Sequence, residues 1–234
     1  MSRSRKSLSL IVPVYNECGL VEKAIRECID GLEKSFEDFE LILIDDGSSD
    51  GTGDALGSFA KAEPERVILL RNNINLNVGV SVQRGMAIAS KDFIVHDAID
   101  FPLAVSDMSR LVEEMDDCDV LVIERETYAS YTPWRWVTSK INRLLLRLLY
   151  GVSDIRDMNF TQFYRRQCLK RIMPLAKSPA FTTPEMIIRA RRSGMRVKAV
   201  TVPYMPRTSG SGAFGRPHDI LWTMYDMFRY RIRA

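Results

Sequence analysis

Carboxylate side chains gather at three points of the sequence, each directly after an apolar run of strand length. The three groups are Glu17, Asp45 to Asp50, and Asp97 with Asp100. Carboxylate oxygens bind hard divalent cations and accept hydrogen bonds from ribose hydroxyls or from a base N–H. This pattern indicates a site that holds a nucleotide, with Asp97 and Asp100 placed to hold an ion that clamps a diphosphate.

The second group of carboxylates lies in a glycine-containing turn. Gly47 and Gly51 flank the run and permit left-handed backbone conformations there. A purely structural alternative is that Asp50 or Thr52 caps the following helix. The two roles are compatible, because one carboxylate can cap the helix while another binds a ligand.

The elements that must position these groups alternate between strands and helices. The sequence predicts strands over residues 7–14, 39–44, 66–70, 92–95, 119–123, 157–164 and 195–202. It predicts helices over 20–32, 52–61, 78–90, 105–115, 134–149, 166–173 and 184–193, and a last one from 217. This order predicts an α/β fold with a mostly parallel central sheet flanked by helices. Ligands of such sheets bind beyond the carboxyl ends of the strands, which is where the carboxylates fall.

The small net charge of +3 hides a division between the two parts of the chain. Residues 160–234 contain 15 Lys and Arg against 3 Asp and Glu, whereas the first 159 residues contain 18 against 27. We expect one domain over residues 1–215 and a basic C-terminal helix over 216–234. The basic part predicts an anionic partner, either a phosphate group or a membrane surface. Nucleic acid is not expected, because the aromatic residues there are not spaced as a stacking platform.

Cysteine usage and hydropathy narrow the cellular setting. The four cysteines form no C-x-x-C pair, which is typical of reduced thiols in a cytosolic protein. No run of about 18 apolar residues occurs, so we expect no transmembrane helix. The expected location is cytoplasmic, with peripheral attachment to the inner face of a membrane as a further option.

Two N-terminal motifs resemble the opening of family 2 glycosyltransferases, which have the GT-A fold. They are Leu10-Ile-Val-Pro-Val-Tyr-Asn-Glu17 and Leu43-Ile-Asp-Asp-Gly-Ser-Ser-Asp-Gly-Thr52, and Asn77-Val-Gly-Val and Arg84-Gly-Met-Ala-Ile-Ala-Ser90 continue the similarity. Three later segments resemble the polyprenyl-phosphate branch of the family, which includes dolichol-phosphate mannose synthases. These segments begin at Asp157, Arg189 and Val202, and the resemblance covers roughly residues 8–215.

The resemblance implies an inverting transfer of a sugar from GDP-mannose or a UDP-hexose to a polyprenyl phosphate, with Mg²⁺ or Mn²⁺. It implies that the nucleotide is lined by Pro13, Tyr15 and Glu17 and that its base or ribose is contacted by Asp45 or Asp46. It implies that Asp97 and Asp100 hold the metal and take part in the reaction. Arg135 and Ser139 would bind the acceptor phosphate, and Arg207 would bind the donor diphosphate.

Two departures from the family pattern leave alternatives open. The family's metal motif is Asp-x-Asp, but here Asp97 and Asp100 stand three residues apart, so a shared ion needs a bent loop, or only one of them binds. The basic residue expected soon after Arg207 is missing, although Arg216 stands in a shifted position. These departures are consistent with altered metal use or with lost activity. The alternative to an active transferase is therefore a catalytically silent protein that binds a nucleotide sugar.

The acceptor decides whether a general base is required. A lipid phosphate is already anionic near neutral pH, so that positioning dominates. A soluble family 2 transferase that acts on a saccharide hydroxyl would instead need a carboxylate within hydrogen-bond reach, and Glu185 is the candidate. The alternative for Glu185 is an acidic residue that stabilises the first turn of a helix.

The predicted helix over 134–149 has an apolar face interrupted by basic residues. Its members are Trp134, Val137, Ile141, Leu144, Leu145, Leu148 and Leu149. This face fits either a bilayer interface or the protein's own core. The basic end of the last helix, residues 227–233, is open to the same two interpretations.

Overall fold

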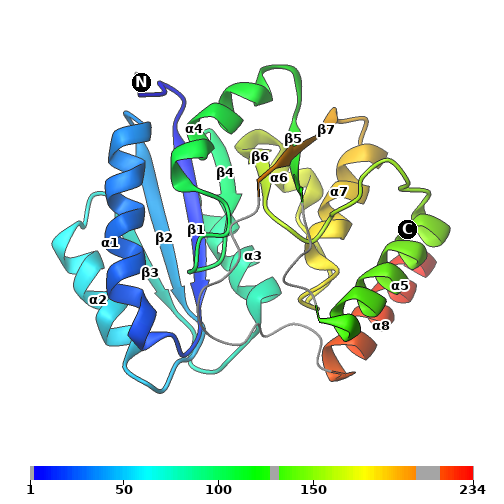
Figure 1. The fold of residues 1–234 in the computed structure, drawn as a ribbon, viewed down its shortest axis with the longest axis horizontal. Helices are drawn as coiled ribbons and strands as arrows, with labels where there is room; N and C mark the ends of the chain where they lie inside the picture. Colours follow the sequence, from blue (N-terminus) through cyan, green and yellow to red (C-terminus); the bar gives the residue numbers. More distant parts are fainter. Residues whose placement is uncertain (1–2, 127–131, 204–216, 234) are drawn as a thin grey trace.

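The computed structural model describes residues 3–126, 132–203 and 217–233 as one seven-stranded sheet with helices packed on both faces (Figure 1). The strands are β1 (Leu8–Val14), β2 (Phe39–Asp45), β3 (Val67–Arg71), β4 (Phe93–His96), β5 (Val120–Arg125), β6 (Gln162–Arg165) and β7 (Val197–Val202). The helices are α1 (Cys18–Ser35), α2 (Thr52–Ala62), α3 (Val78–Ile88), α4 (Val105–Glu113), the 3₁₀ turn η1 (Glu114–Asp117), α5 (Pro133–Tyr150), α6 (Arg166–Ile172), α7 (Thr182–Arg192) and α8 (Pro217–Arg233).

The sheet is mixed but mostly parallel, as the sequence predicts. Its order is β3-β2-β1-β4-β6-β5-β7, and only β6 runs antiparallel to its two neighbours. The expected strand over residues 157–164 is wrong for residues 157–161, because the strand begins only at Gln162. The segment before Gln162 is held by side-chain hydrogen bonds instead. Asp157 pairs with Arg125, and the Gln162 side chain donates to the Met158 carbonyl at 2.7 Å.

Alternate residues of the central strands feed two separate cores. Leu10, Val12 and Leu43 pack in one core with apolar residues of α1 and α4. Ile11 and Ile42 point to the other face, where α3, α5, α7 and α8 contribute. This period-two alternation fixes the register, because a slip by one residue would exchange the two faces.

The C-terminal helix α8 is packed against the rest of the fold. Met227 is fully buried, and the Tyr150 hydroxyl at the end of α5 donates to the Met227 carbonyl at 2.5 Å. Asp226 accepts hydrogen bonds from the backbone N–H groups of Lys177 and Ser178, at 3.0 and 2.9 Å. The helices α5 and α8 therefore lie side by side in Figure 1.

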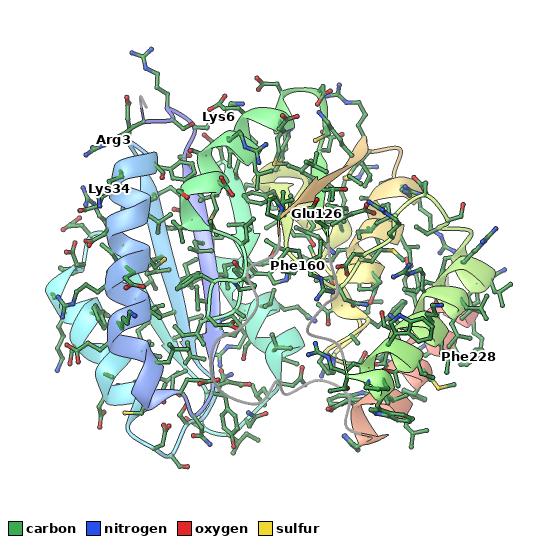
Figure 2. All side chains as sticks on the ribbon, in the orientation of Figure 1. Arg3, Lys6, Lys34, Glu126, Phe160 and Phe228 are labelled. Carbon is green, nitrogen blue, oxygen red and sulfur yellow. The ribbon has the colours of Figure 1, made fainter. Side chains whose placement is uncertain are left out.

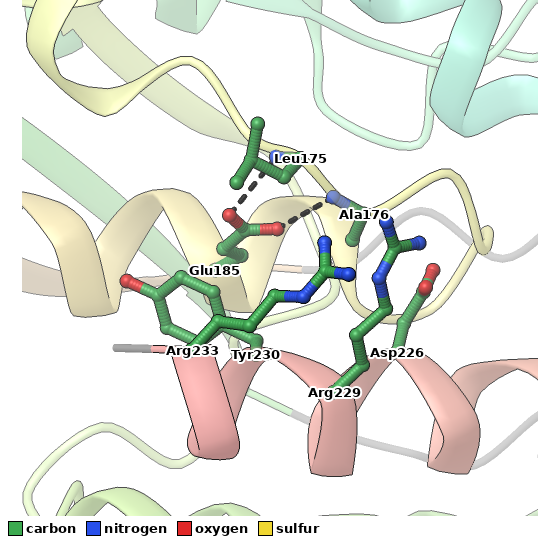
Figure 3. Close-up of a pocket in the computed structure, with 7 residues that line it drawn as sticks. All are labelled: Leu175, Ala176, Glu185, Asp226, Arg229, Tyr230 and Arg233. Carbon is green, nitrogen blue, oxygen red and sulfur yellow. Dashed lines mark hydrogen bonds between the residues drawn. The ribbon is translucent and has the colours of Figure 1, made fainter.

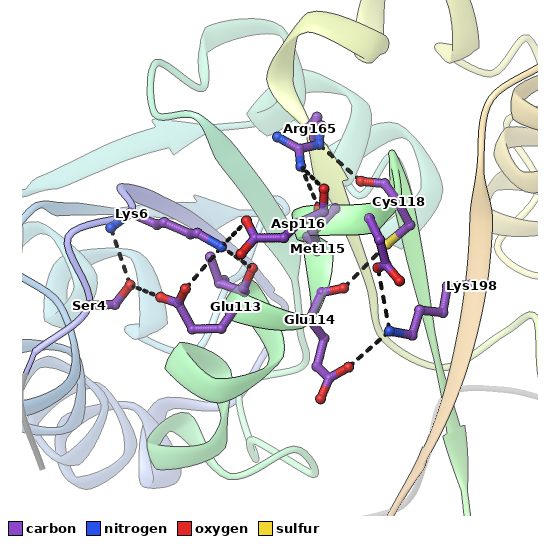
Figure 4. Close-up of polar contacts among 11 residues, drawn as sticks. Ser4, Lys6, Glu113, Glu114, Met115, Asp116, Cys118, Arg165 and Lys198 are labelled. Atoms are coloured by element: carbon purple, nitrogen blue, oxygen red, sulfur yellow. Dashed lines mark hydrogen bonds and ion pairs between the residues drawn. The ribbon is translucent and has the colours of Figure 1, made fainter.

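A polar cluster ties the N-terminal segment to the end of α4 (Figure 4). Lys6 Nζ lies 3.0 Å from Glu113 Oε2 and 2.6 Å from Asp116 Oδ1, and the Ser4 hydroxyl donates to Glu113 at 2.7 Å. Arg165 donates from β6 to the carbonyls of Cys118 and Met115 in the same region. The cluster lies at the amino end of β1, away from the carboxyl ends of the parallel strands.

No helix in the described ranges is long and apolar enough to cross a bilayer.

Candidate active site

The three carboxylate groups follow three neighbouring strands. β1 pairs in parallel with β2, with Val14 opposite Asp45, and on its other side with β4, with Ile11 opposite His96. The carboxyl ends of these strands therefore meet at one edge of the sheet. The sequence-based prediction that the strand order gathers these groups is confirmed for this part of the fold.

The loops after β1 and β2 hold each other through reciprocal hydrogen bonds. The backbone N–H of Asn16 donates to the Ser48 hydroxyl, and the backbone N–H of Ser49 donates to the Asn16 side chain, both at 3.0 Å. Asn16 has a positive φ of 51°, a conformation that asparagine tolerates. This coupling places Tyr15, which is 48% exposed, and the half-buried Pro13 and Glu17 at the rim of the site.

Asp45 is held close to the first turn of α2. Its Oδ1 accepts a hydrogen bond from the backbone N–H of Ser48 at 2.9 Å. A Cβ atom on Gly53 would lie only 2.2 Å from Asp45 Oδ2, so the carboxylate occupies space that any other residue at position 53 would need. Gly53 is thus a supporting residue that the sequence analysis missed.

Asp46 has a different environment from its neighbour. Its Oδ1 accepts three hydrogen bonds, from the Asn72 side chain at 2.6 Å and from the Leu76 backbone and Ser81 hydroxyl at 2.9 Å. These donors come from the segment between β3 and α3 and from α3 itself. Asp46 therefore ties the end of β2 to that segment.

Asp97 is the most unusual group at this edge. Its Oδ1 accepts from the Ala98 N–H at 2.9 Å and from the Thr161 hydroxyl at 3.3 Å, whereas its buried Oδ2 has no partner among the described residues. Burial, with a smaller contribution from the charge of Asp100, raises the pKa of the Asp97 carboxyl to about 8. Beside it, burial lowers the pKa of the His96 imidazole to about 4.

The donor set at Asp97 can be tested against a divalent cation. A bound cation would give the buried Oδ2 of Asp97 the partner that it lacks among the described residues. The half-buried carboxylate of Asp100 lies nearby and could bind the same ion. Ile99, which stands between the two aspartates, is buried in the core and cannot contribute. Across residues 3–126, 132–203 and 217–233 no three metal-binding side chains converge, so substrate oxygens and water would have to complete the coordination. The residues fit an ion of that kind.

The residues expected at the acceptor phosphate lie at the start of α5. Arg135 and Ser139 stand one helical turn apart, so they share a face, and both are half-buried. Thr132 caps the helix and accepts a hydrogen bond from the Arg135 N–H at 3.3 Å. Arg207 and Arg216 lie outside the described residues.

Glu185 is built into the interior of the protein. One carboxylate oxygen accepts from the Leu175 N–H at 2.9 Å and the other from the Ala176 N–H at 2.7 Å (Figure 3). Arg189 Nε lies 2.7 Å from Oε1 of the same carboxylate, and the Glu185 side chain is fully buried. This arrangement matches the structural alternative for Glu185, because the residue lies in the first turn of α7 and its carboxylate is fully buried with both oxygens already accepting hydrogen bonds.

Two further contacts at the same edge escaped the sequence analysis. Arg125, at the carboxyl end of β5, pairs with Asp157 at 2.6 Å in a buried ion pair, and its guanidinium lies 5.1 Å from the Phe160 ring centre. Thr161 donates to Asp97, as described above. The partners are 32 and 64 residues apart in sequence, so no local pattern could reveal them.

Comparison with known proteins identifies relatives that match most of the chain. The chain is 29% identical over 213 residues to the dolichyl-phosphate beta-glucosyltransferase of Trichomonas vaginalis, covering 84% of this chain and 65% of that protein. It is 27% identical over 209 residues to the glycosyltransferase AglD of Haloferax volcanii, covering 86% of this chain and 33% of that protein. The chain thus spans at most about two thirds of the length of these relatives.

Solved structures of similar fold include two complexes with Mn²⁺. One is a mannosyltransferase of Pyrobaculum calidifontis with GDP-mannose and Mn²⁺, with a TM-score of 0.69, 17% identity, and coverage of 99% of this chain and 65% of that chain. The other is glucosyl-3-phosphoglycerate synthase of Mycobacterium tuberculosis with Mn²⁺ and UDP, with a TM-score of 0.69, 18% identity, and coverage of 97% and 80%. The expected GT-A fold is confirmed. Residues 9–174 match the model of glycosyl transferase family 2, and the chain therefore belongs to that family of glycosyltransferases.

Proposed function

We propose that this glycosyltransferase moves a sugar from a nucleotide diphosphate sugar to a polyprenyl phosphate. The observation that carries the donor half of the proposal is the buried Asp97 carboxylate, whose Oδ2 has no partner in the described part of the chain. It lies at the carboxyl edge of β4, beside the loops after β1 and β2. The divalent cation that accompanies a leaving diphosphate would supply the positive charge that this carboxylate lacks.

The donor residues of the proposal are those that the resemblance to the family implies. Pro13, Tyr15 and Glu17 at the rim would line the nucleotide, and Asp45 would accept a hydrogen bond from its base or ribose. Asp97 and Asp100 would hold Mg²⁺ or Mn²⁺, which neutralises the diphosphate as it leaves. By resemblance to the family, Arg207 would contact the same diphosphate.

The transfer itself exchanges one bond at the anomeric carbon. The bond to the donor diphosphate breaks, and an oxygen of the acceptor phosphate forms the new bond from the opposite side, which inverts the configuration. The attacking phosphate oxygen carries no proton near neutral pH, so the protein has to position it rather than deprotonate it. The closed environment of Glu185 supports this acceptor over a hydroxyl, because the carboxylate named as a base is not available.

The acceptor half rests on α5. Arg135 and Ser139 would bind the acceptor phosphate at the beginning of this helix. Further along, Val137, Ile141, Leu144 and Leu148 are exposed, whereas Leu146 is buried in the core. Basic side chains, including Arg143 and Arg147, flank the exposed face, as in helices that lie in a bilayer interface. The proposal therefore places the enzyme on the cytoplasmic face of a membrane, in line with the lipid substrate named for the Trichomonas relative.

A second candidate is nucleotide-sugar binding without transfer. One observation favours it. In an Asp-x-Asp motif that starts at Asp97 the second aspartate would stand at position 99, and this position is occupied by the buried Ile99. A soluble family 2 transferase with a saccharide hydroxyl as acceptor is a third candidate, and it would require a base other than Glu185.

Calorimetric titration of GDP-mannose and UDP-glucose, with and without Mn²⁺, tests the donor site. We expect binding of one donor that strengthens with Mn²⁺, and a loss of at least about tenfold in that affinity in Asp97→Asn, because the isosteric amide removes a charged ligand. Asp30→Asn, on the exposed side of α1, is the matched control and should bind as the wild type does. Absence of any nucleotide binding would contradict the proposal and both alternatives.

A further inference from the structure

A hollow lined by arginines lies between α7 and α8, away from the candidate active site. It has a volume of about 320 Å³ and is lined by Arg171, Arg189, Arg192 and Arg233 together with Tyr230. A smaller adjoining cavity of about 30 Å³ shares Tyr230 and Arg233 and adds Arg229 (Figure 3). We call the two together the arginine hollow, defined by these five arginines.

The positive charge of the arginine hollow is largely uncompensated. Two carboxylates border it, Glu185 and Asp226, and both already accept backbone hydrogen bonds. Among the described residues, Arg189 is the only one of the five arginines that forms an ion pair, and its partner is Glu185. Within the described residues Arg229 and Arg233 pair with no carboxylate. Cations gathered in a concave surface attract an anion, and the field there is stronger than on a flat surface.

Aromatic stacking holds two of these guanidinium groups in place. Arg189 lies 5.3 Å and Arg192 lies 5.5 Å from the centre of the Tyr230 ring. Tyr230 in turn packs edge-on against the buried Phe181, with 6.0 Å between the ring centres. A guanidinium fixed in this way presents its N–H fork at little entropic cost, and that fork matches a phosphate group. The hollow is thus suited to a phosphate anion.

An exposed apolar stripe runs along α8 beside the arginine hollow. Leu221, Tyr225, Phe228 and Ile232 recur at helical spacing and are all exposed, and Ile232 is 85% exposed. Figure 2 shows Phe228 on the outer side of the helix. Arg229 and Arg233 directly follow the last two members of the stripe, so one helix carries both the apolar face and part of the hollow. A free phosphate compound has no apolar part that could contact such a stripe. A phospholipid has both a phosphate for the arginine hollow and apolar chains beside the stripe.

We propose that the arginine hollow binds the phosphate of an anionic phospholipid headgroup while the stripe on α8 enters the bilayer interface. This site is separate from the proposed acceptor site. The hollow lies near Tyr150 at the end of α5, because the Arg192 guanidinium is 6.0 Å from the Tyr150 ring centre. Arg135 stands 15 residues earlier on that helix, which corresponds to about 22 Å along its axis.

Co-sedimentation with lipid vesicles tests the site. The vesicles contain phosphatidylcholine alone or phosphatidylcholine with about a third of phosphatidylglycerol, an anionic lipid. We expect the wild type to bind the anionic vesicles preferentially, and Arg229→Gln/Arg233→Gln to bind them about 30-fold more weakly, as expected for two arginines near the surface. The control Lys23→Gln/Arg26→Gln removes two charges from α1 and should bind like the wild type.

Several outcomes would overturn the proposal. Equal binding of the wild type to both kinds of vesicle, or unchanged binding of the α8 double variant, would remove the headgroup site. Stabilisation of the wild type but not the double variant by inorganic phosphate, without vesicle binding, would assign the hollow to a soluble anion. A dimer seen by light scattering without lipid and lost in Ile232→Ser would assign the stripe to a second copy of the chain.

Two accompanying measurements keep the test independent. Thermal unfolding by circular dichroism should give similar midpoints for the double variant and the wild type, since neither arginine has an ion-pair partner in the part of the chain described. Donor titration on the double variant should match the wild type, because the hollow lies outside the donor site. Failure of the lipid site would thus leave donor binding intact, and failure of the proposed transfer function would leave vesicle binding intact.

Discussion

At the scale of single residues, adjacent aspartates in one motif have different roles. Asp45 accepts a hydrogen bond from the Ser48 N–H and fills the space that a Cβ on Gly53 would need, whereas Asp46 Oδ1 accepts from three donors in the segment after β3 and in α3. The two residues are of the same type and adjacent in the sequence. The difference arises from which neighbours the fold brings to each carboxylate.

The contact between Asp45 and Gly53 leads to a prediction for donor affinity. Gly53→Ala adds a methyl group where Asp45 Oδ2 lies, so the carboxylate must move, and we expect nucleotide affinity to fall about tenfold or more. Gly57→Ala is the matched control on the same helix, because its Cβ would meet mainly the flexible end of Arg71, at 3.0 Å. Calorimetry on both variants checks this. Equal donor affinity in the two variants would show that Asp45 does not contact the nucleotide.

Residue types alone could identify the carboxylates at the strand ends but not all of their partners. Asp97 could be selected because it follows a predicted buried strand. Thr161, which donates to it, could not, because it lies 64 residues away in a segment predicted to be a strand. The burial that raises the pKa of Asp97 also depends on the whole fold. The sequence therefore could predict where the candidate site lies, but only some of the contacts between its residues.

At the scale of elements, the edge of the sheet is held together by side-chain bonds between its loops. Ser81 on α3 is fully buried, donates to Asp46 and accepts from the Asn72 side chain at 2.9 Å. Asn72 also contacts Asp46 directly. This network connects the ends of β2 and β3 to the start of α3, so it fixes the wall of the site next to Asp45.

Removal of one member of this network should cost stability. Ser81→Ala leaves Asp46 and Asn72 each without one buried partner, so we expect the free energy of unfolding to fall by about 1–3 kcal/mol. Ser58→Ala removes an exposed hydroxyl on α2 and is the control. Urea denaturation monitored by circular dichroism gives both values. A loss no larger than that of the control would mean that water replaces the Ser81 hydroxyl without penalty.

The order of the elements could be predicted, because apolar runs of strand length alternate with helical periodicity. The direction of β6 could not, because a strand buried on both faces reads the same in either direction. Its late start at Gln162 also escaped prediction, since the bond that holds Asp157, near the start of the expected strand, comes from Arg125 on β5. Such contacts between distant segments override local strand propensity.

At the scale of the whole molecule, the division of charge corresponds to a division of the fold. The acidic first part contains β1 to β5, α5 and the carboxylates at the sheet edge, whereas the basic second part contains β6, β7 and the arginine hollow. The apolar face predicted for residues 134–149 is divided too. Leu145 and Leu149 pack against the core, while Val137, Ile141, Leu144 and Leu148 are exposed. The core interpretation thus holds for Leu145 and Leu149, whereas the bilayer interpretation stays a prediction for the exposed residues.

The N-terminal cluster in Figure 4 gives a pH-dependent prediction for the whole fold. Hydrogen bonds from Ser4 and Lys6 lower the pKa of Glu113, and the bond from Lys6 lowers that of Asp116. Acids with a lowered pKa in the folded state stabilise it above the unfolded pKa, and this contribution is lost as the pH falls through the folded pKa. We therefore expect Lys6→Gln to be less stable than the wild type near pH 7, and the difference to shrink below about pH 4.

Urea unfolding of both proteins at pH 7, 5 and 3.5 measures that difference, with Lys23→Gln as a control for an exposed lysine in a longer ion pair of 3.9 Å. A difference that stays constant down to the lowest pH would show that the charges of Glu113 and Asp116 do not contribute through Lys6.

The most direct test of the central claim is transfer of label from a donor to a lipid. Radiolabelled GDP-mannose or UDP-glucose is incubated with the protein, Mn²⁺ and a short polyprenyl phosphate, and the lipids are then extracted. The account predicts label in the organic phase that requires both the acceptor and Mn²⁺ and is lost in Asp97→Asn. Label that remains wholly in the aqueous phase, with a protein shown to bind the donor, would contradict it.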